Sequence, residues 1–173
     1  MGTPNCGLIR SFLALAGSSG APLGLMREKA RSISLSYPAL YQVLSIYPAA
    51  FDARGHAIDL FQQDDWVPPD CLPYLENGRR FRQELPDSSS VPTLCVFGHG
   101  VKTPTKVIFQ TSSERWWEGE GRVEFDDGDG DVPTRSAVLR GAEIHPVRQH
   151  HGSLYIDQDV RARLTRELFR PSS

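Results

Sequence analysis

An acidic, glycine-rich segment at residues 124–136 constrains the chain most, because a histidine-bearing segment follows it at residues 149–154. The first segment reads Glu-Phe-Asp-Asp-Gly-Asp-Gly-Asp-Val-Pro-Thr-Arg-Ser, a composition typical of a flexible loop. The second reads Gln-His-His-Gly-Ser-Leu and comes after a strand-like run at 142–147. An aspartate on one loop and a histidine on the next are typical of two members of a Ser–His–Asp triad. Asp129 and His151 are therefore the candidate catalytic residues.

The third member of such a triad is a serine on a sharp turn between a strand and a helix. Residues 12–16 are apolar throughout, which predicts a strand buried on both faces, and a turn signal follows them. Ser19 lies in this turn in a loose form of Gly-x-Ser-x-Gly. However, Pro22 and Gly24 follow at once, where the motif needs a helix. Ser19 is thus a weak candidate nucleophile, and a plain loop at the exit of a strand is the favoured interpretation.

Composition excludes several classes of protein. The 173 residues suit one domain, and a net charge of −2 gives no electrostatic reason to expect nucleic acid as a partner. The sequence has no apolar run of about 18 residues and no signal-peptide pattern, so it predicts no transmembrane segment. Its three cysteines are odd in number and widely spaced, which predicts neither a disulfide framework nor a zinc site. We expect a cytoplasmic protein without a cofactor.

The rest of the chain predicts a core and a cap. Residues 26–75 combine many aromatic residues with prolines, which favours a cap of short helices. Trp66 is the best candidate there for a lipid-facing, substrate-binding side chain, although the favoured alternative is that these aromatics pack the cap onto the domain. A helix is expected at 73–85, with Arg79, Arg80 and Arg82 towards water. The remaining expected elements are a strand at 93–97, a hairpin with arms at 107–110 and 121–125, and a helix capped by Asp157 with Val160, Leu164 and Leu168 as its apolar stripe.

Metal binding explains the acidic segment poorly. An EF-hand loop beginning at Asp127 would need glycine at its sixth position and glutamate at its twelfth, but Val132 and Val138 stand there. His145, His150 and His151 lack a zinc-ligand spacing, so we predict no metal site. A glycosidase pair is disfavoured, because carboxylates so close along one loop would not reliably straddle a sugar bond. A solvated acidic turn stays as the plain alternative.

Several motifs together resemble the lecithin:cholesterol acyltransferase family, α/β-hydrolases that move acyl chains between lipids or to water. The segment 128–136 resembles the family's Gly-Asp-Gly-Thr-Val-Pro-x-x-Ser, with Asp131 in place of threonine. The segment 151–154 resembles its His-Gly-x-Leu. Residues 97–104 resemble its Tyr-Gly-x-Gly-x-x-Thr-Pro turn, and residues 13–22 resemble its Leu-Gly-Thr-Pro-x-x-Gly-Ser-Pro loop. The chain is thus similar to the family's C-terminal half.

The resemblance implies an α/β fold, a partial α/β-hydrolase with a mostly parallel sheet and a hairpin insertion. It implies one partial domain over 1–173, with the cap at about 26–75 and the core that bears Asp129 and His151 at 91–173. It also implies a lipid or acyl-ester substrate. The family's serine elbow and oxyanion donors have no counterpart in the sequence, so we expect a truncated protein that is inactive alone. The alternatives are a small hydrolase that uses Ser19 and a non-catalytic lipid- or protein-binding module. An unpaired strand edge at 12–16 would further favour self-association or pairing with an N-terminal half.

Overall fold

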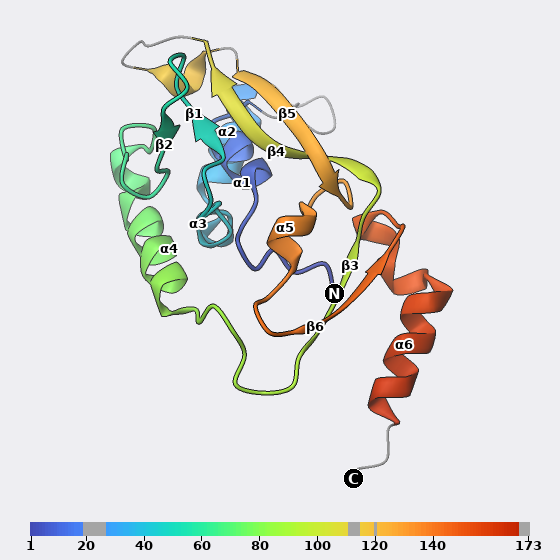
Figure 1. Ribbon diagram of the computed structural model, residues 1–173. Helices are drawn as coiled ribbons and strands as arrows, with labels where there is room; N and C mark the ends of the chain where they lie inside the picture. The colour runs from blue at the N-terminus through green and yellow to red at the C-terminus, as the bar shows by residue number, and fades with distance from the viewer. Residues whose placement is uncertain (19–26, 111–114, 120, 170–173) are drawn as a thin grey trace. The chain divides into compact units, whose positions relative to one another are not determined.

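The computed structural model describes residues 1–18, 27–110, 115–119 and 121–169 (Figure 1). It shows an α/β protein in which helices accompany two small sheets, as the expected α/β class requires. The chain falls into two compact units. The Asp129 unit comprises Met1–Asn5, Asp87–Thr103 and Asp126–Ser173, and the aromatic unit comprises Cys6–Pro86 and Pro104–Phe125. The expected core at 91–173 is therefore interrupted by a segment of the aromatic unit.

The aromatic unit carries most of the helices, namely α1 (Ile9–Leu15), α2 (Arg27–Leu35), α3 (Pro38–Gln42), α4 (Leu72–Glu84) and the 3₁₀ turns η2 (Pro69–Cys71) and η3 (Trp116–Glu118), with strands β1 (Ala50–Phe51) and β2 (Ala57–Ile58). The Asp129 unit carries β3 (Leu94–Gly98), α5 (Thr134–Ala137), β6 (Glu143–Val147), η4 (His151–Ile156) and α6 (Gln158–Leu168). Both units share the strands β4 (Val101–Phe109) and β5 (Gly121–Gly128).

The strands form one sheet of four and one of two. The larger has the order β2-β1-β4-β5, in which β1 runs antiparallel to β2 and parallel to β4. The smaller pairs β3 with β6 in parallel. A single, mostly parallel sheet is thus not plainly present in the described residues. The expected strand at 93–97 and the expected hairpin are both present as β3 and β4–β5, and the hairpin arms are longer than expected.

Residues 12–16 do not form the expected strand, because Ile9–Leu15 is the α-helix α1. The helix is buried on nearly every side, and its four large apolar side chains are at most 5% exposed. The Ser11 hydroxyl is also buried and donates to the carbonyls of Leu8 and Val43, at 2.7 and 3.1 Å. A helix enclosed in this way has the same unbroken apolar sequence as a doubly covered strand. The unpaired strand edge that we expected at these residues therefore does not exist.

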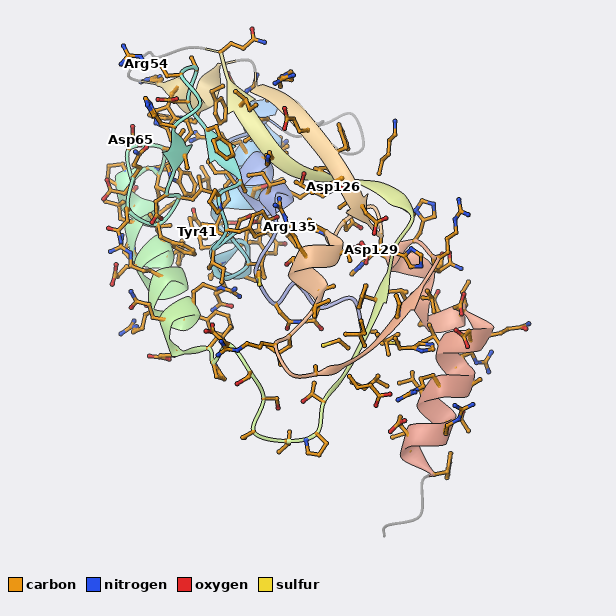
Figure 2. All side chains as sticks on the ribbon, in the orientation of Figure 1. Tyr41, Arg54, Asp65, Asp126, Asp129 and Arg135 are labelled. Carbon is orange, nitrogen blue, oxygen red and sulfur yellow. The ribbon has the colours of Figure 1, made fainter. Side chains whose placement is uncertain are left out.

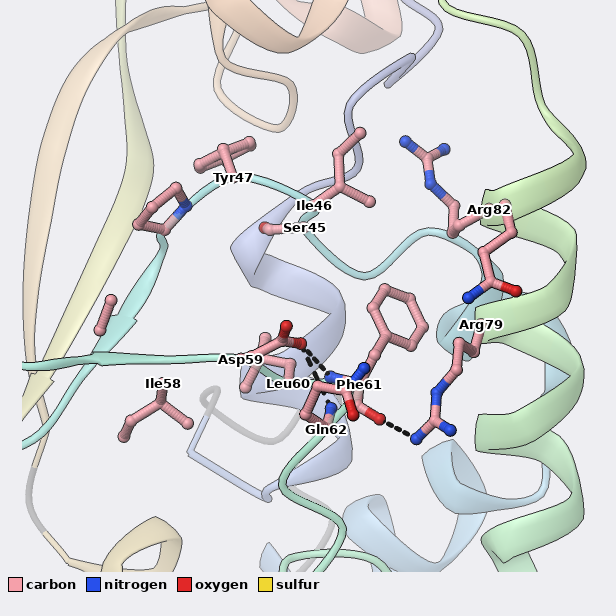
Figure 3. Close-up of a pocket in the computed structure, with 13 residues that line it drawn as sticks. Ser45, Ile46, Tyr47, Ile58, Asp59, Leu60, Phe61, Gln62, Arg79 and Arg82 are labelled. Carbon is pink, nitrogen blue, oxygen red and sulfur yellow. Dashed lines mark hydrogen bonds between the residues drawn. The ribbon is translucent and has the colours of Figure 1, made fainter.

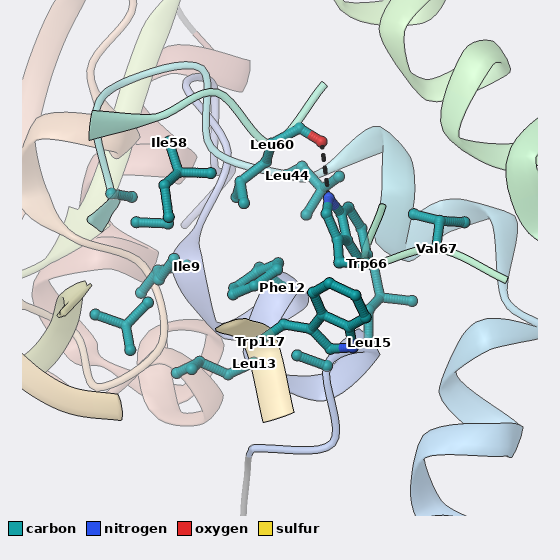
Figure 4. Packing of buried hydrophobic residues seen from close by; sticks show 14 of the residues in the cluster. Ile9, Phe12, Leu13, Leu15, Leu44, Ile58, Leu60, Trp66, Val67 and Trp117 are labelled. Carbon is teal, nitrogen blue, oxygen red and sulfur yellow. Dashed lines mark hydrogen bonds between the residues drawn. The ribbon is translucent and has the colours of Figure 1, made fainter. Parts of the chain in front are cut away.

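The core of the aromatic unit is a cluster of rings around Phe12 and Trp66 (Figure 4). The Phe12 ring meets the Trp66 ring edge-on at a centroid distance of 5.2 Å, and the Tyr41 ring stacks on Trp66 at 6.4 Å. The Trp66 indole N–H donates to the Leu60 carbonyl at 3.3 Å, so its one polar atom is satisfied inside the core. Trp66 is 1% exposed, and the hypothesis that it faces lipid is wrong.

The helices at 73–85 and after Asp157 are confirmed as α4 and α6. The Asp157 carboxylate accepts from the amides of Asp159 and Val160, which caps α6 as expected. The predicted stripe on α6 is correct only in its first two members, since Val160 is buried and Leu164 packs beside it while Leu168 is 79% exposed. No helix in the described ranges has the length and apolar character needed to cross a bilayer.

Candidate functional site

The parallel pair β3–β6 in the Asp129 unit positions the site. The register pairs Gly98 with Val147, so the two strands end at the same edge of their sheet. The His99 amide donates to the Val147 carbonyl at 2.9 Å and extends this pairing by one residue. After β3 the chain makes the β4–β5 hairpin and returns to Asp129, which forms a bridge with Val101 near the end of β3. Parallel strands of an α/β protein present their functional loops at this carboxyl edge.

Gly98 brings the returning loop close to the strand. A Cβ atom at Gly98 would lie 2.6 Å from the Cβ of Asp129 and would also overlap the carbonyl oxygen of Gln149. A side chain at this position would therefore push apart the two segments that carry Asp129 and His151. Gly98 does not have the positive φ angle that favours glycine. The close approach of Asp129 and Gln149 is therefore the reason why a glycine is needed here.

The Asp129 carboxylate is almost fully buried, and the groups that it contacts are hydrogen-bond donors. Asp129 is 1% exposed, and its Oδ1 accepts from the amides of Asp131 and Val132 at 3.0 and 2.7 Å. Its Oδ2 lies 2.9 Å from the Nδ1 atom of His151. Figure 2 labels Asp129 on the loop that follows β5. A buried carboxylate that accepts several hydrogen bonds is held in one orientation and cannot rotate away from its partners.

His151 is held by its backbone and by its ring. Its amide donates to the Asp129 carbonyl at 2.9 Å, and its side chain is 39% exposed. With Nδ1 directed at an acceptor-only carboxylate, the neutral ring carries its proton on Nδ1 and leaves Nε2 as a proton acceptor. The backbone of Gly2 covers part of the ring, because a Cβ there would lie 2.9 Å from His151 Cε1. The Gly2 amide is itself fixed by a 2.8 Å hydrogen bond to the Val96 carbonyl.

A neighbouring carboxylate, Asp127, fixes the acidic loop to the turn after β3. Its Oδ2 accepts from the Thr134 hydroxyl and its Oδ1 from the Gly100 amide, both at 2.6 Å. The Thr134 hydrogen bond and the Gly100 amide hold the pKa of Asp127 below its ordinary value, with His99 nearby adding to the effect. We had not expected this role from the sequence. The sequence held no local signal for it, because Thr134 lies seven positions after Asp127 and the bond joins two side chains.

The structure thus brings Asp129 and His151 within hydrogen-bond distance, as the chain order predicted. Ser19, the weak candidate nucleophile, lies outside the described residues, and Trp66 lies in the core of the other unit. His145 is engaged elsewhere, with Nε2 3.1 Å from a carboxylate oxygen of Asp159 on α6. Within the described part of the chain, no group of three or more His, Cys, Asp or Glu side chains is arranged to hold a metal ion.

Comparison with known proteins adds one partial relative. No protein-family model matches the chain. A stretch of 73 residues is 34% identical to the "Uncharacterized gene 83 protein" of Gallid herpesvirus 2. That stretch is 41% of this chain and 57% of the viral protein, so the chain spans less than two thirds of its relative. The name of the viral protein states no activity, and the site's chemistry has to be argued from its geometry.

Proposed function

We propose that Asp129 and His151 are the aspartate and the general base of a catalytic triad for serine-type acyl transfer. The observation that carries this proposal is the pairing itself, in which a buried and fully engaged carboxylate faces Nδ1 of a histidine that keeps access to solvent. The exposed part of the ring leaves Nε2 free to meet a reacting group. The substrate class, lipid acyl esters, comes from the resemblance of residues 128–136 and 151–154 to the lecithin:cholesterol acyltransferase family.

In this proposal His151 moves a single proton in each half of the reaction. Its Nε2 accepts the hydroxyl proton as a serine oxygen attacks the ester carbonyl and the carbonyl π electrons move onto oxygen. The imidazolium then gives that proton to the departing alkoxide as the tetrahedral intermediate collapses to an acyl-serine. Water or an acceptor alcohol repeats the cycle and frees the serine. Asp129 stays ionised and stabilises the charged imidazole throughout.

The same proposal assigns the chain to a partial α/β-hydrolase fold. The parallel pair β3–β6 supports the assignment, because both catalytic candidates follow the carboxyl ends of these strands. The β4–β5 hairpin is then an insertion between β3 and its aspartate-bearing loop. The sequence contains no Gly-x-Ser-x-Gly motif. We therefore propose that the serine elbow comes from a segment outside residues 1–173, with Ser19 as the alternative.

The reading frame upstream of the Met1 codon provides the first test. An in-frame Gly-x-Ser-x-Gly there is the expected result. The longer product is then treated with a fluorophosphonate probe, which modifies only activated serines. We expect the elbow serine to be labelled, and His151→Ala to slow labelling by about 100-fold or more. Asp129→Asn should slow it as well, because the neutral ring then carries its proton on Nε2 and cannot accept the serine proton there. His150→Ala, the adjacent histidine, is the matched control and should label at the unchanged rate.

Three results would redirect the proposal. Labelling of the 173-residue chain that is lost in Ser19→Ala would favour the small self-sufficient hydrolase. An elbow serine that labels equally well in His151→Ala would show that His151 is not its base. If no serine were labelled, in the chain or in the longer product, the result would favour the alternative of a non-catalytic binding module.

A further inference from the structure

The aromatic unit contains a pocket of about 360 Å³ between the segment after α3, the segment around β2, and α4 (Figure 3). Its size lies within the range of small-molecule sites in proteins. Every residue that lines it belongs to this unit, so it is separate from the Asp129–His151 site. The lining residues are Ser45, Ile46, Tyr47, Pro48, Ala57, Ile58, Asp59, Leu60, Phe61, Gln62, Arg79, Arg82 and Gln83.

One part of the lining is apolar. Ile58, Leu60 and Phe61 are all buried and continue into the core cluster of the unit, so they form a firm wall. Ile46 is 52% exposed, which makes this part of the lining reachable from solvent. Such a surface suits a hydrocarbon chain, because moving methylene groups from water onto apolar side chains is favourable.

Another part of the lining is cationic. Arg79 and Arg82 stand three positions apart on α4 and therefore share one side of that helix. The Arg79 guanidinium donates to the Phe61 carbonyl and pairs with Glu76 at 3.0 Å, which fixes its position. Its Nε is buried and has no hydrogen-bond partner among the described residues. Both arginines are half-buried, against the expectation that they point to water.

Burial lowers the pKa of Arg82 from its ordinary value, although an arginine stays charged at any physiological pH. Two further polar groups of the lining bear on the charge it can accept, namely Ser45 and Asp59. The Ser45 hydroxyl is buried, its residue is 5% exposed, and it has no partner among the described residues. The Asp59 carboxylate is already engaged, since its Oδ1 accepts from the amides of Phe61 and Gln62 at 2.9 and 3.2 Å. Counted over the lining residues alone, two arginines and one aspartate give a formal charge of +1, and Glu76, the partner of Arg79, lies outside the lining.

We propose that this pocket binds a single-chain carboxylate, an amphiphile whose head is taken by the arginine side and Ser45 and whose chain lies on Ile58 and Phe61. A carboxylate matches the planar guanidinium fork, and its single negative charge balances the net charge of the lining. A phosphomonoester is disfavoured, because its charge of about −1.5 to −2 at neutral pH exceeds what the lining offsets. The proposal holds whether or not Asp129 and His151 are catalytic.

Calorimetric titration of the full chain with octanoate and octanol tests the inference, because the two ligands share a chain and differ in the head. Octanoate should bind about tenfold more tightly, which corresponds to one hydrogen bond to a charged group. Arg82→Gln should remove that difference. Arg80→Gln is the matched control, since Arg80 is exposed on the same helix and does not line the pocket. Octyl phosphate, used as a third ligand, should bind more weakly than octanoate.

A second variant protects the test against loss of folding in Arg82→Gln. Ile46→Glu places a negative charge on an exposed lining residue, where the fold tolerates it, and should weaken octanoate more than octanol. Equal affinity for octanoate and octanol in the wild-type protein would overturn the proposal. The proposal would also be overturned if Arg82→Gln and Ile46→Glu bound octanoate with the same affinity as the control Arg80→Gln. Tighter binding of octyl phosphate than of octanoate would overturn the choice of head group.

Discussion

Gly98 and Asp129 are in contact so close that a methyl group at position 98 would lie 2.6 Å from the Asp129 Cβ atom. This contact joins the end of β3 to the loop that orients His151. Gly98→Ala should therefore destabilise the Asp129 unit by about 1–3 kcal/mol, the usual range for overpacking. Chemical denaturation monitored by amide exchange within β3 and β6 would measure the loss.

Gly152→Ala is the control for that substitution. Gly152 lies beside His151 in η4, and a Cβ there would have no heavy atom within 4 Å. Its stability should change by no more than about 0.5 kcal/mol. Equal effects of the two alanines would contradict the tight packing of Gly98 against Asp129.

Asp129→Asn should reverse the proton position on the His151 ring. The asparagine can keep an oxygen towards the amides of Asp131 and Val132, and its NH₂ group then faces Nδ1. Because that group donates, neutral His151 should move its proton from Nδ1 to Nε2. The ¹⁵N shifts of the imidazole, recorded where the ring is neutral, report this directly. Asp126→Asn, an exposed change on the same loop, should leave the tautomer as it is. An unchanged tautomer in Asp129→Asn would show that the pair does not orient the ring.

Trp66→Ala should cost about 3–5 kcal/mol, as truncations of large buried aromatics do. The substitution removes ring contacts with Phe12 and Tyr41 and leaves the Leu60 carbonyl without its donor. Tyr37→Ala, which truncates a ring that is 57% exposed, should cost no more than about 0.5 kcal/mol. Urea unfolding followed by circular dichroism would compare them. If both substitutions lowered the free energy of unfolding by a similarly small amount, Trp66 would not be the core residue described here.

The stability of α6 should fall as the solution is acidified below about pH 4, where a free aspartate takes up a proton. The Val160 amide, with Gln149 and the Asp159 amide, holds the pKa of Asp157 below its ordinary value. A carboxylate whose pKa is depressed by folding stabilises the folded state above its unfolded pKa, and the contribution is lost as pH falls through the folded pKa. Amide protection in α6, followed from about pH 5 down to about pH 2, would show this loss.

Asp157→Asn separates the charge from the cap. Asparagine caps helices about as well as aspartate does but does not titrate, so this part of the acid sensitivity should disappear while α6 stays formed at neutral pH. Asp157→Ala should weaken the first turn of α6 at every pH. If the asparagine variant lost protection at the same pH as the wild type, other groups would have to carry the effect.

The sequence predicted the parts of this protein that depend on local chemistry. Asp129 and His151 lie together because a glycine-flexed loop and a strand end each place one residue, and Asp157 caps α6 through the amides that follow it. The Asp157 cap needs only the two residues that follow it, whereas the Asp129–His151 pair was predicted from chain order and also depends on the β3–β6 pairing and on Gly98. The short strands β1 and β2 carry no such local pattern, and the pairing of β1 with β4 depends on residues far along the chain.

The errors arose where burial in the folded state decided the outcome. The apolar run at 12–16 has no helical periodicity, because α1 is buried on nearly every side and leaves no polar face to mark the turns. Trp66 stands among acidic residues and prolines in the sequence, yet its ring is enclosed by residues from α1 and α3. Arg79 and Arg82 have a charged sequence context typical of a solvated helix face. They are half-buried because the segment around Phe61 packs beside α4.

The aromatic cluster also determines what optical spectroscopy can see in this protein. All three tryptophans, Trp66, Trp116 and Trp117, lie in the aromatic unit and are at most 8% exposed. Indole emission therefore reports the solvation of that unit alone and carries no signal from the unit that holds Asp129 and His151. A melting curve recorded by tryptophan fluorescence would miss a separate transition of the Asp129 unit, whose aromatic reporter is the exposed Tyr155. Two probes, one for each unit, are needed before the unfolding of this chain can be described as a single event.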